Sequence, residues 1–213
     1  MIEKKGRESN FKEYWKKFWF LFWKDDSLKG WIFSLVLIFV LIKFIIFPTL
    51  NFFTGTNIPL AIVESCSMHH NGVFLHNFNL WWDKHKDKYQ EYGITKEGFE
   101  NFPFKNGFSK GDILFIVKPN PKDVKIGDVI IFNANKKYPI IHRVINIKEE
   151  NGKLVFSTIG DNNWGQFEFE EAISEDQIIG KAIFKVAPYL GWGKLIFFEP
   201  FKPSQERGFC KEN

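Results

Sequence analysis

Apolar residues gather in one long segment near the N-terminus of the chain. Residues 31–47 are almost all apolar, and with the continuation to residue 53 the run has about 23 residues, or roughly 35 Å as a helix. Lys43 lies inside the run, but its long aliphatic stem lets the ammonium group reach the lipid headgroups. Pro48 lies close to the interface, where it is accommodated. The pattern predicts one transmembrane helix at residues 29–53.

Beyond this segment, short apolar runs alternate with turn residues. The runs are rich in Ile, Val and Phe and are separated by Gly, Pro, Asn and Asp, which is typical of β-strands. They cover residues 60–63, 112–118, 128–133, 138–147, 153–159 and 177–186. Residues 71–108 break this pattern, since they are polar and helix-favouring, with Thr95 as an N-cap. We expect a mainly β domain with a helical insertion at about 71–108.

The chain therefore divides into three predicted parts. Residues 1–28 form a basic and aromatic leader, residues 29–53 the membrane anchor, and residues 54–213 one domain of about 160 residues, enough for a core of its own. Aromatic residues and lysines alternate within residues 11–23, as in an interfacial helix. We interpret the leader as a helix that adheres to the inner leaflet, with a regulatory or targeting role as the alternative.

Charge predicts the orientation of the anchor. Residues 54–73 contain no Lys or Arg, whereas the leader is basic, so the positive-inside rule places the N-terminus in the cytoplasm and the β domain outside. The basic residues before Trp31 are Lys4, Lys5, Arg7, Lys12, Lys16, Lys17, Lys24 and Lys29. A cleavable signal peptide is the alternative, but the apolar run is long and no small-x-small site follows it. We expect a retained anchor.

Composition argues against other classes of protein. The net charge is only +4, and the lysines are scattered among acids, so we expect no nucleic-acid partner. The chain has two cysteines, Cys66 and Cys210, which are too few for a disulfide framework. They also do not form a Cys-x-x-Cys pair that could bind zinc. A single bridge between them is an open alternative that we do not expect.

Three separated residues suggest serine-protease chemistry. A serine hydroxyl needs a neighbouring base to attack a carbonyl, and Ser67 lies in the run Ser-Cys-Ser-Met shortly after the anchor. His142 lies within an apolar strand and is a candidate base, although a core histidine satisfied by the backbone is the plain alternative. Asp161 would orient the imidazole, but Gly-Asp-Asn-Asn is also a common turn sequence. The three residues follow the order nucleophile, base and acid.

These motifs together resemble the ordered boxes of type I signal peptidases, over about residues 55–193. The boxes are residues 65–68, 111–114, 127–130, 141–144 and 160–163, and residues 188–192 resemble the family's closing stretch. His142 stands where the common bacterial form has lysine, so the resemblance is to the archaeal and endoplasmic-reticulum form. It implies a signal-peptidase-like β catalytic domain with Ser67 as nucleophile, His142 as general base and Asp161 as acid. The Ser67 N–H and the Ser65 hydroxyl would form the oxyanion hole.

The chain departs from the family pattern at two places. Family members often have a second aspartate after the Gly-Asp-Asn-Asn box, whereas here Glu168 is the candidate substitute. His70 replaces the proline that usually follows the nucleophile box, and the insertion begins just after it. The loop beyond the nucleophile should therefore have a different shape.

The insertion and the two histidines just before it also offer residues that could bind a metal. The candidates are His69, His70, His76, His85, Asp83 and Asp87. Their spacing matches no compact zinc pattern, and the acids lie among lysines, so we expect neither a metal nor another cofactor.

The expected protein is a membrane-anchored serine endopeptidase that removes signal peptides from exported preproteins. Its expected partners are these preproteins, the lipid bilayer and the protein-export machinery, and its oligomeric state stays open. We expect a single-pass protein of a cell membrane, with the endoplasmic-reticulum membrane and a lumenal domain as the alternative. A non-catalytic binding module of the same fold, or a protease that cuts other membrane-proximal sites, are the alternative functions.

Overall fold

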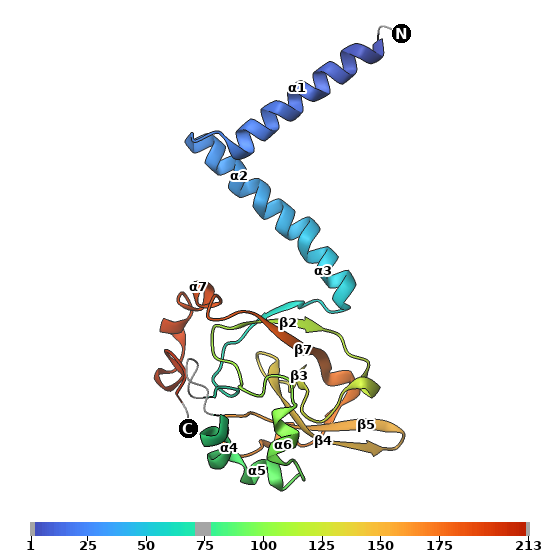
Figure 1. The fold of residues 1–213 in the computed structure, drawn as a ribbon, viewed down its shortest axis with the longest axis vertical. Helices are drawn as coiled ribbons and strands as arrows, with labels where there is room; N and C mark the ends of the chain where they lie inside the picture. The colour runs from blue at the N-terminus through green and yellow to red at the C-terminus, as the bar shows by residue number, and fades with distance from the viewer. Residues whose placement is uncertain (1–2, 71–77, 212–213) are drawn as a thin grey trace. The chain divides into compact units, whose positions relative to one another are not determined.

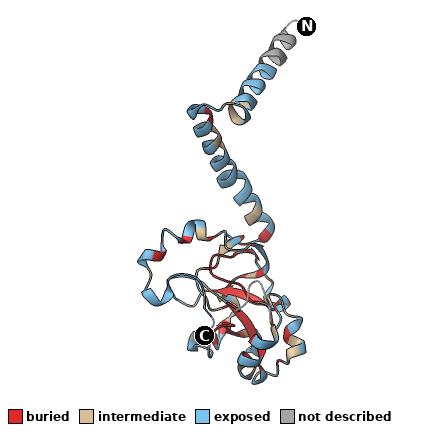
Figure 2. Cartoon of the chain, turned by 60° about the vertical axis from the view of Figure 1, so that its left-hand side comes forward, coloured by how far each residue is buried: buried red, intermediate tan, exposed pale blue. Residues whose placement is uncertain are grey.

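The computed structural model describes residues 3–70 and 78–211, and it divides the chain into two units, Met1–Phe53 and Thr54–Asn213 (Figure 1). The first unit is helical. It contains α1 (Glu3–Trp23), α2 (Leu28–Leu41), the π-helical turn η1 (Ile42–Ile46) and α3 (Phe47–Thr54). The elements from α2 to α3 form one continuous helix, Leu28–Thr54, of 27 residues, which is long and apolar enough to cross a membrane. Figure 2 shows that most positions of this helix are exposed, and many of these positions carry large apolar side chains.

The start of this long helix and its wide turn both follow from local chemistry. Ser27 caps α2, because its hydroxyl accepts a hydrogen bond from the Gly30 N–H at 3.2 Å. Pro48 has no N–H, and in a regular helix its ring would collide with the carbonyl of Phe44. The π-helical turn η1 ends two residues before this proline and contains Phe44, so the backbone is widened where the collision would occur.

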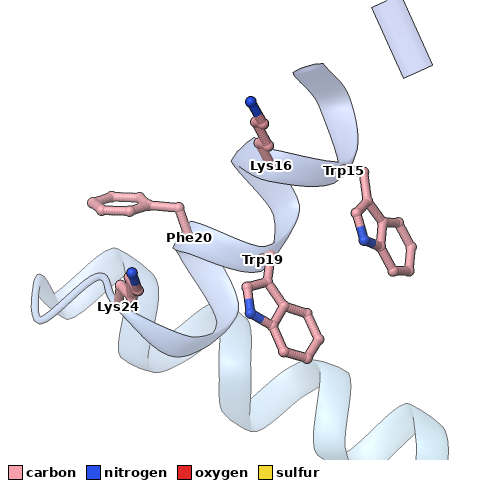
Figure 3. Close-up of a pocket in the computed structure, with 5 residues that line it drawn as sticks. All are labelled: Trp15, Lys16, Trp19, Phe20 and Lys24. Carbon is pink, nitrogen blue, oxygen red and sulfur yellow. The ribbon is translucent and has the colours of Figure 1, made fainter. Parts of the chain in front are cut away.

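Aromatic residues cover much of α1. The rings of Phe11 and Trp15 stack, as do those of Trp19 and Trp23, at the spacing of one helical turn. Trp15, Lys16, Trp19, Phe20 and Lys24 line a shallow hollow on this helix (Figure 3). The helix therefore presents exposed aromatic rings together with lysines, the combination typical of a membrane interface.

Over its described residues, the second unit is built on one antiparallel sheet of seven strands, so the prediction of a mainly β domain is confirmed. The spatial order of the strands is β1-β2-β7-β3-β4-β5-β6. Their bounds are β1 (Leu60–Ile62), β2 (Ile113–Val117), β3 (Val129–Phe132), β4 (Ile140–Glu150), β5 (Lys153–Ile159), β6 (Ile173–Ser174) and β7 (Ile178–Ala187). The two-residue strand β6 was not predicted, because so short a run has no periodicity. Short 3-10 turns lie at η2 (Pro121–Asp123), η3 (Glu168–Glu170) and η4 (Glu175–Gln177).

The strands carry the core of the second unit. Every residue of β3 is buried, as expected for a strand covered on both faces. Buried positions follow the strands in Figure 2. One apolar cluster includes Val63, Met68 and Leu114, so the segment just after β1 is anchored in the core.

The described part of the predicted insertion, residues 78–108, contains short helices joined by turns. It contains α4 (Phe78–His85), α5 (Asp87–Gln90) and α6 (Lys96–Glu100), and Thr95 caps α6 by accepting a hydrogen bond from the Gly98 N–H at 3.1 Å. These helices lie next to β4 and β5 in Figure 1. Their buried rings, which include Trp81, Tyr89 and Phe99, pack with Ile145 of β4 and Ile159 of β5. The insertion thus covers the sheet close to the candidate site.

The C-terminal segment returns to the start of the domain, which the sequence did not predict. It contains α7 (Trp192–Leu195), η5 (Glu199–Phe201) and η6 (Ser204–Glu206). Cys210 then forms a disulfide with Cys66, and the two Cα atoms are 5.3 Å apart. The expectation that these cysteines stay unpaired is therefore wrong, because a sequence separation of 144 residues gave no local signal of their proximity.

Candidate active site

Ser67 lies in the loop that follows β1. The ladder of β1 with β2 continues through Val63, whose N–H donates to Asp112 O at 2.9 Å, and the chain then turns through Ser65 and Cys66. Ser67 is half-buried, and its Oγ lies 3.1 Å from the Oγ of the exposed Ser65. The structure therefore brings both predicted serines together through their hydroxyl groups.

The Gly-Asp-Asn-Asn loop, residues 160–163, forms hydrogen bonds with the backbone around Ser67. The N–H of Asn162 donates to Ser67 O at 2.7 Å, and the Asn162 side-chain amide donates to Cys66 O at 3.1 Å. Gly160 has a steric role, since a Cβ at this position would lie 2.9 Å from Ser67 O. Gly160 follows Ile159, which pairs with Arg143, the neighbour of His142. The sheet thus brings the nucleophile loop, defined as residues 64–67 with the candidate nucleophile Ser67, to the part of β4 that carries the candidate base.

His142 is buried on β4 opposite Ile130 of β3. Its Nδ1 forms a hydrogen bond with the carboxylate of Glu170. The alternative of a core histidine satisfied by the backbone is therefore not what the structure shows. With the proton on Nδ1 directed at the carboxylate, Nε2 is the nitrogen that can accept a proton from a hydroxyl.

Glu170, rather than either predicted acid, is the partner of His142. It ends η3, and its second carboxylate oxygen accepts a hydrogen bond from the Phe167 N–H at 2.9 Å. Thr158 also donates to the oxygen that faces His142, at 3.3 Å. Glu168 is exposed at the start of η3, so the structure contradicts its assignment as the second acid. The sequence offers several glutamates here, and only the 3-10 turn decides which one points inward.

Asp161 lies in a different hydrogen-bond network from the one expected. Its carboxylate accepts two hydrogen bonds from Arg143, at 2.9 and 2.7 Å, one from Tyr89 at 2.8 Å and one from His70 at 2.9 Å. Burial would raise the pKa of Asp161, but the Arg143 guanidinium and these hydrogen bonds hold it well below its usual range. Its prediction as the acid that orients His142 is therefore corrected. Asp161 is fully engaged by a buried ion pair and supports the loop next to Ser67.

His70, which directly precedes the insertion, and Lys88, which lies within it, both take part in this network. His70 stacks on Trp81 with ring centroids 3.7 Å apart, and burial lowers the pKa of His70 to about 4 although Asp161 opposes the shift. Lys88 donates to the carbonyl oxygens of Gly160, Asp161 and Asn163 at 3.3, 2.7 and 2.6 Å. Burial lowers the pKa of Lys88 to about 8, again against the effect of Asp161. Lys88 of the insertion thus stabilises the Gly-Asp-Asn-Asn loop, which binds the backbone of Ser67.

The histidines considered as metal ligands have other contacts. His69 Nδ1 lies 2.7 Å from Ser109 Oγ, and His85 Nδ1 lies 2.8 Å from Trp81 O. His76 lies outside the described residues. Over residues 3–70 and 78–211, no group of three or more His, Cys, Asp or Glu side chains is arranged to hold a metal ion.

Ser67, His142 and Glu170 are residues of the types used in acyl transfer. A serine hydroxyl, an imidazole and a carboxylate that holds the imidazole are the groups that this chemistry needs. In the described part of the chain, the hydrogen-bond partner of Ser67 Oγ is Ser65 Oγ rather than His142. Catalytic hydrogen bonds are often long before substrate binds, so this geometry is compatible with a base at His142.

Comparisons with known proteins agree with the motifs. No protein-family model matches the chain. It is 44% identical over 61 residues to a signal peptidase complex catalytic subunit SEC11 from Lachancea thermotolerans, a match that covers 27% of this chain and 36% of the relative. It is 38% identical over 58 residues to the signal peptidase complex catalytic subunits SEC11C of Canis lupus familiaris and Homo sapiens, which covers 26% of this chain and 30% of each relative. The chain thus spans about a third of the length of these curated relatives. The resemblance to type I signal peptidases of the archaeal and endoplasmic-reticulum form is confirmed.

Proposed function

We propose that this chain is a membrane-anchored serine endopeptidase that cleaves signal peptides from exported preproteins. The observation that carries the proposal is the His142–Glu170 pair on β4, because the neighbouring Arg143 pairs with Ile159 and the chain just beyond Ile159 hydrogen-bonds Ser67. The similarity to catalytic subunits of signal peptidase complexes supports the substrate class.

The residues have distinct roles in this proposal. His142 Nε2 takes the proton of Ser67 Oγ while that oxygen attacks the scissile carbonyl. Glu170 keeps the other imidazole nitrogen protonated and stabilises the imidazolium as it forms. The imidazolium gives its proton to the leaving amine, and the acyl-enzyme on Ser67 is then hydrolysed by a water that the same imidazole activates. The Ser67 N–H and the Ser65 hydroxyl stabilise the oxyanion.

Two free strand edges suggest how a substrate binds. Over the described residues, β1 is an edge strand that pairs only with β2, and the pairing of β4 with β5 begins at Arg143, after His142. The residues before His142 and those of β1 thus each have an edge free for backbone hydrogen bonds. An extended peptide added between them would place its scissile bond near Ser67 and His142.

The membrane defines the remaining part of the proposal. The helix Leu28–Thr54 anchors the chain, α1 lies on the cytoplasmic leaflet, and the β domain faces outward. The apolar core of a signal peptide would lie in the same bilayer, so the membrane supplies part of the proximity between enzyme and bond. We propose a cell membrane as the location and the protein-export machinery as a partner.

A cleavage assay tests the substrate class. The purified chain is reconstituted in lipid nanodiscs with a preprotein, and the N-terminus of each product is sequenced. We expect one cut directly after a small residue that follows the apolar signal core, and loss of cleavage when that residue is changed to Phe. Cuts at unrelated membrane-proximal sites would support a different protease, and binding without cleavage would support a non-catalytic module.

A further inference from the structure

The C-terminal segment 199–211 contacts the nucleophile loop directly. Cys210 is covalently linked to Cys66, the residue that precedes Ser67. The Asn162 side-chain amide, which donates to Cys66 O, also donates to Lys211 O at 3.0 Å. Lys202 Nζ donates to Glu64 O at 3.1 Å. The C-terminal segment therefore holds the run from Glu64 to Ser67 at Glu64 and at Cys66.

This segment is itself fixed to the domain by a buried lysine. Lys110 is almost fully buried, and its Nζ donates to Glu199 Oε2 at 2.8 Å and to Glu206 O at 2.6 Å. Trp192 donates through Nε1 to Lys110 O at 3.0 Å and packs on Phe209, with ring centroids 4.8 Å apart. Because the segment is held by these buried contacts, a bond from it to Cys66 restrains the position of Cys66.

We propose that the Cys66–Cys210 disulfide positions Ser67 for attack, so that turnover depends on the oxidised state of this bond. The inference rests on the proposed function for its kinetic effect. A dithiol such as dithiothreitol would transfer two electrons to the Sγ–Sγ bond, which gives two cysteine thiols and the cyclic disulfide of the reagent. The nucleophile loop would then keep its hydrogen bonds to Asn162 but lose its covalent link. Misplacement of a reacting group by about 1 Å can reduce the rate by about 100-fold.

The kinetic test uses the full chain in nanodiscs and the double variant Cys66→Ser/Cys210→Ser. We expect kcat to fall by about 10- to 100-fold with little change in KM, both in the double variant and in the reduced wild type, and reoxidation to restore the wild type. Dithiothreitol should have no further effect on the double variant. Ser204→Ala, an exposed change on the same segment, is the matched control and should keep full activity. Lys202→Met should lower kcat by a smaller factor.

A second measurement separates positioning from general stability and does not need activity. On reduction, hydrogen exchange should become faster in the amides of residues 64–69, while β3 and β4 keep their protection. These amides include the His69 N–H, which donates to Cys66 O at 3.0 Å. A double variant with wild-type kcat and unchanged exchange at residues 64–69 would overturn the proposal, as would equal loss of protection throughout the sheet. If the wild type cleaves no preprotein, the proposed function fails, and the exchange data still decide the role of the disulfide.

Discussion

The imidazole of His142 and the carboxylate of Glu170 form a buried hydrogen bond, although the two residues are 28 positions apart in the chain. Glu170 reaches this position because η3 turns its side chain inward, where the Phe167 N–H and the Thr158 hydroxyl also bind it. A carboxylate so placed fixes the ring orientation and the tautomer of His142.

Replacement of Glu170 tests this relationship. Glu170→Gln should lower kcat by about 10²- to 10⁴-fold, because the amide supports the imidazole tautomer and the imidazolium poorly. The exposed Glu168→Gln is the control and should keep wild-type kcat. Both are measured by steady-state cleavage of a preprotein. If Glu168→Gln lowered kcat more than Glu170→Gln, Glu168 rather than Glu170 would be the acid that supports His142.

Loss of the Asp161 carboxylate should act mainly on stability. Asp161→Asn leaves the Arg143 guanidinium, which is fully buried, without its counter-charge, and the free energy of unfolding should fall by about 3–5 kcal/mol. Asp83→Asn breaks only an exposed pair with Lys86 and should change it by less than about 1 kcal/mol. Urea unfolding of the detergent-solubilised chain, followed by tryptophan fluorescence, measures both values. Similar stability of the two variants would contradict the structural role of Asp161.

His70 should make the domain less stable in mild acid. Its pKa is about 4 in the folded chain and 6.5 in the unfolded chain, so between these pH values the unfolded state binds more protons. The contribution of His70 is complete above pH 6.5, and between pH 7 and pH 4 the free energy of unfolding should fall by about 3 kcal/mol from this residue. His70→Gln should flatten the urea-unfolding profile in this window, and an unchanged slope would argue against the shift.

Gly160 should not tolerate a side chain, because a Cβ at this position would lie too close to the carbonyl oxygen of Ser67. In Gly160→Ala the new methyl group would lie 2.5 Å from Asn163 Nδ2 and 2.9 Å from Ser67 O, so the nucleophile loop must move. We expect kcat to fall by about 10-fold or more. Gly165→Ala is the matched control, since a Cβ there meets nothing within 4 Å. Equal kcat values for the two variants would show that the loop tolerates displacement.

Local patterns predicted most of the fold. Alternation of apolar runs and turn residues located every strand except β6, and Thr95 marked the start of α6 because capping is a local interaction. Long-range pairing could not be predicted in the same way. The inward turn of Glu170, the ion pair of Asp161 with Arg143 and the link from Cys66 to Cys210 each depend on segments that meet only after the sheet has formed.

The central claim is that Ser67 is the nucleophile, and preprotein cleavage by Ser67→Ala tests it most directly. The account predicts that this variant folds with wild-type stability in detergent and yields no detectable mature product. Ser65→Ala, which changes the neighbouring hydroxyl 3.1 Å away, should lose about 10²- to 10³-fold in kcat and still cleave at the same bond. Cleavage by Ser67→Ala at the wild-type rate would contradict the account.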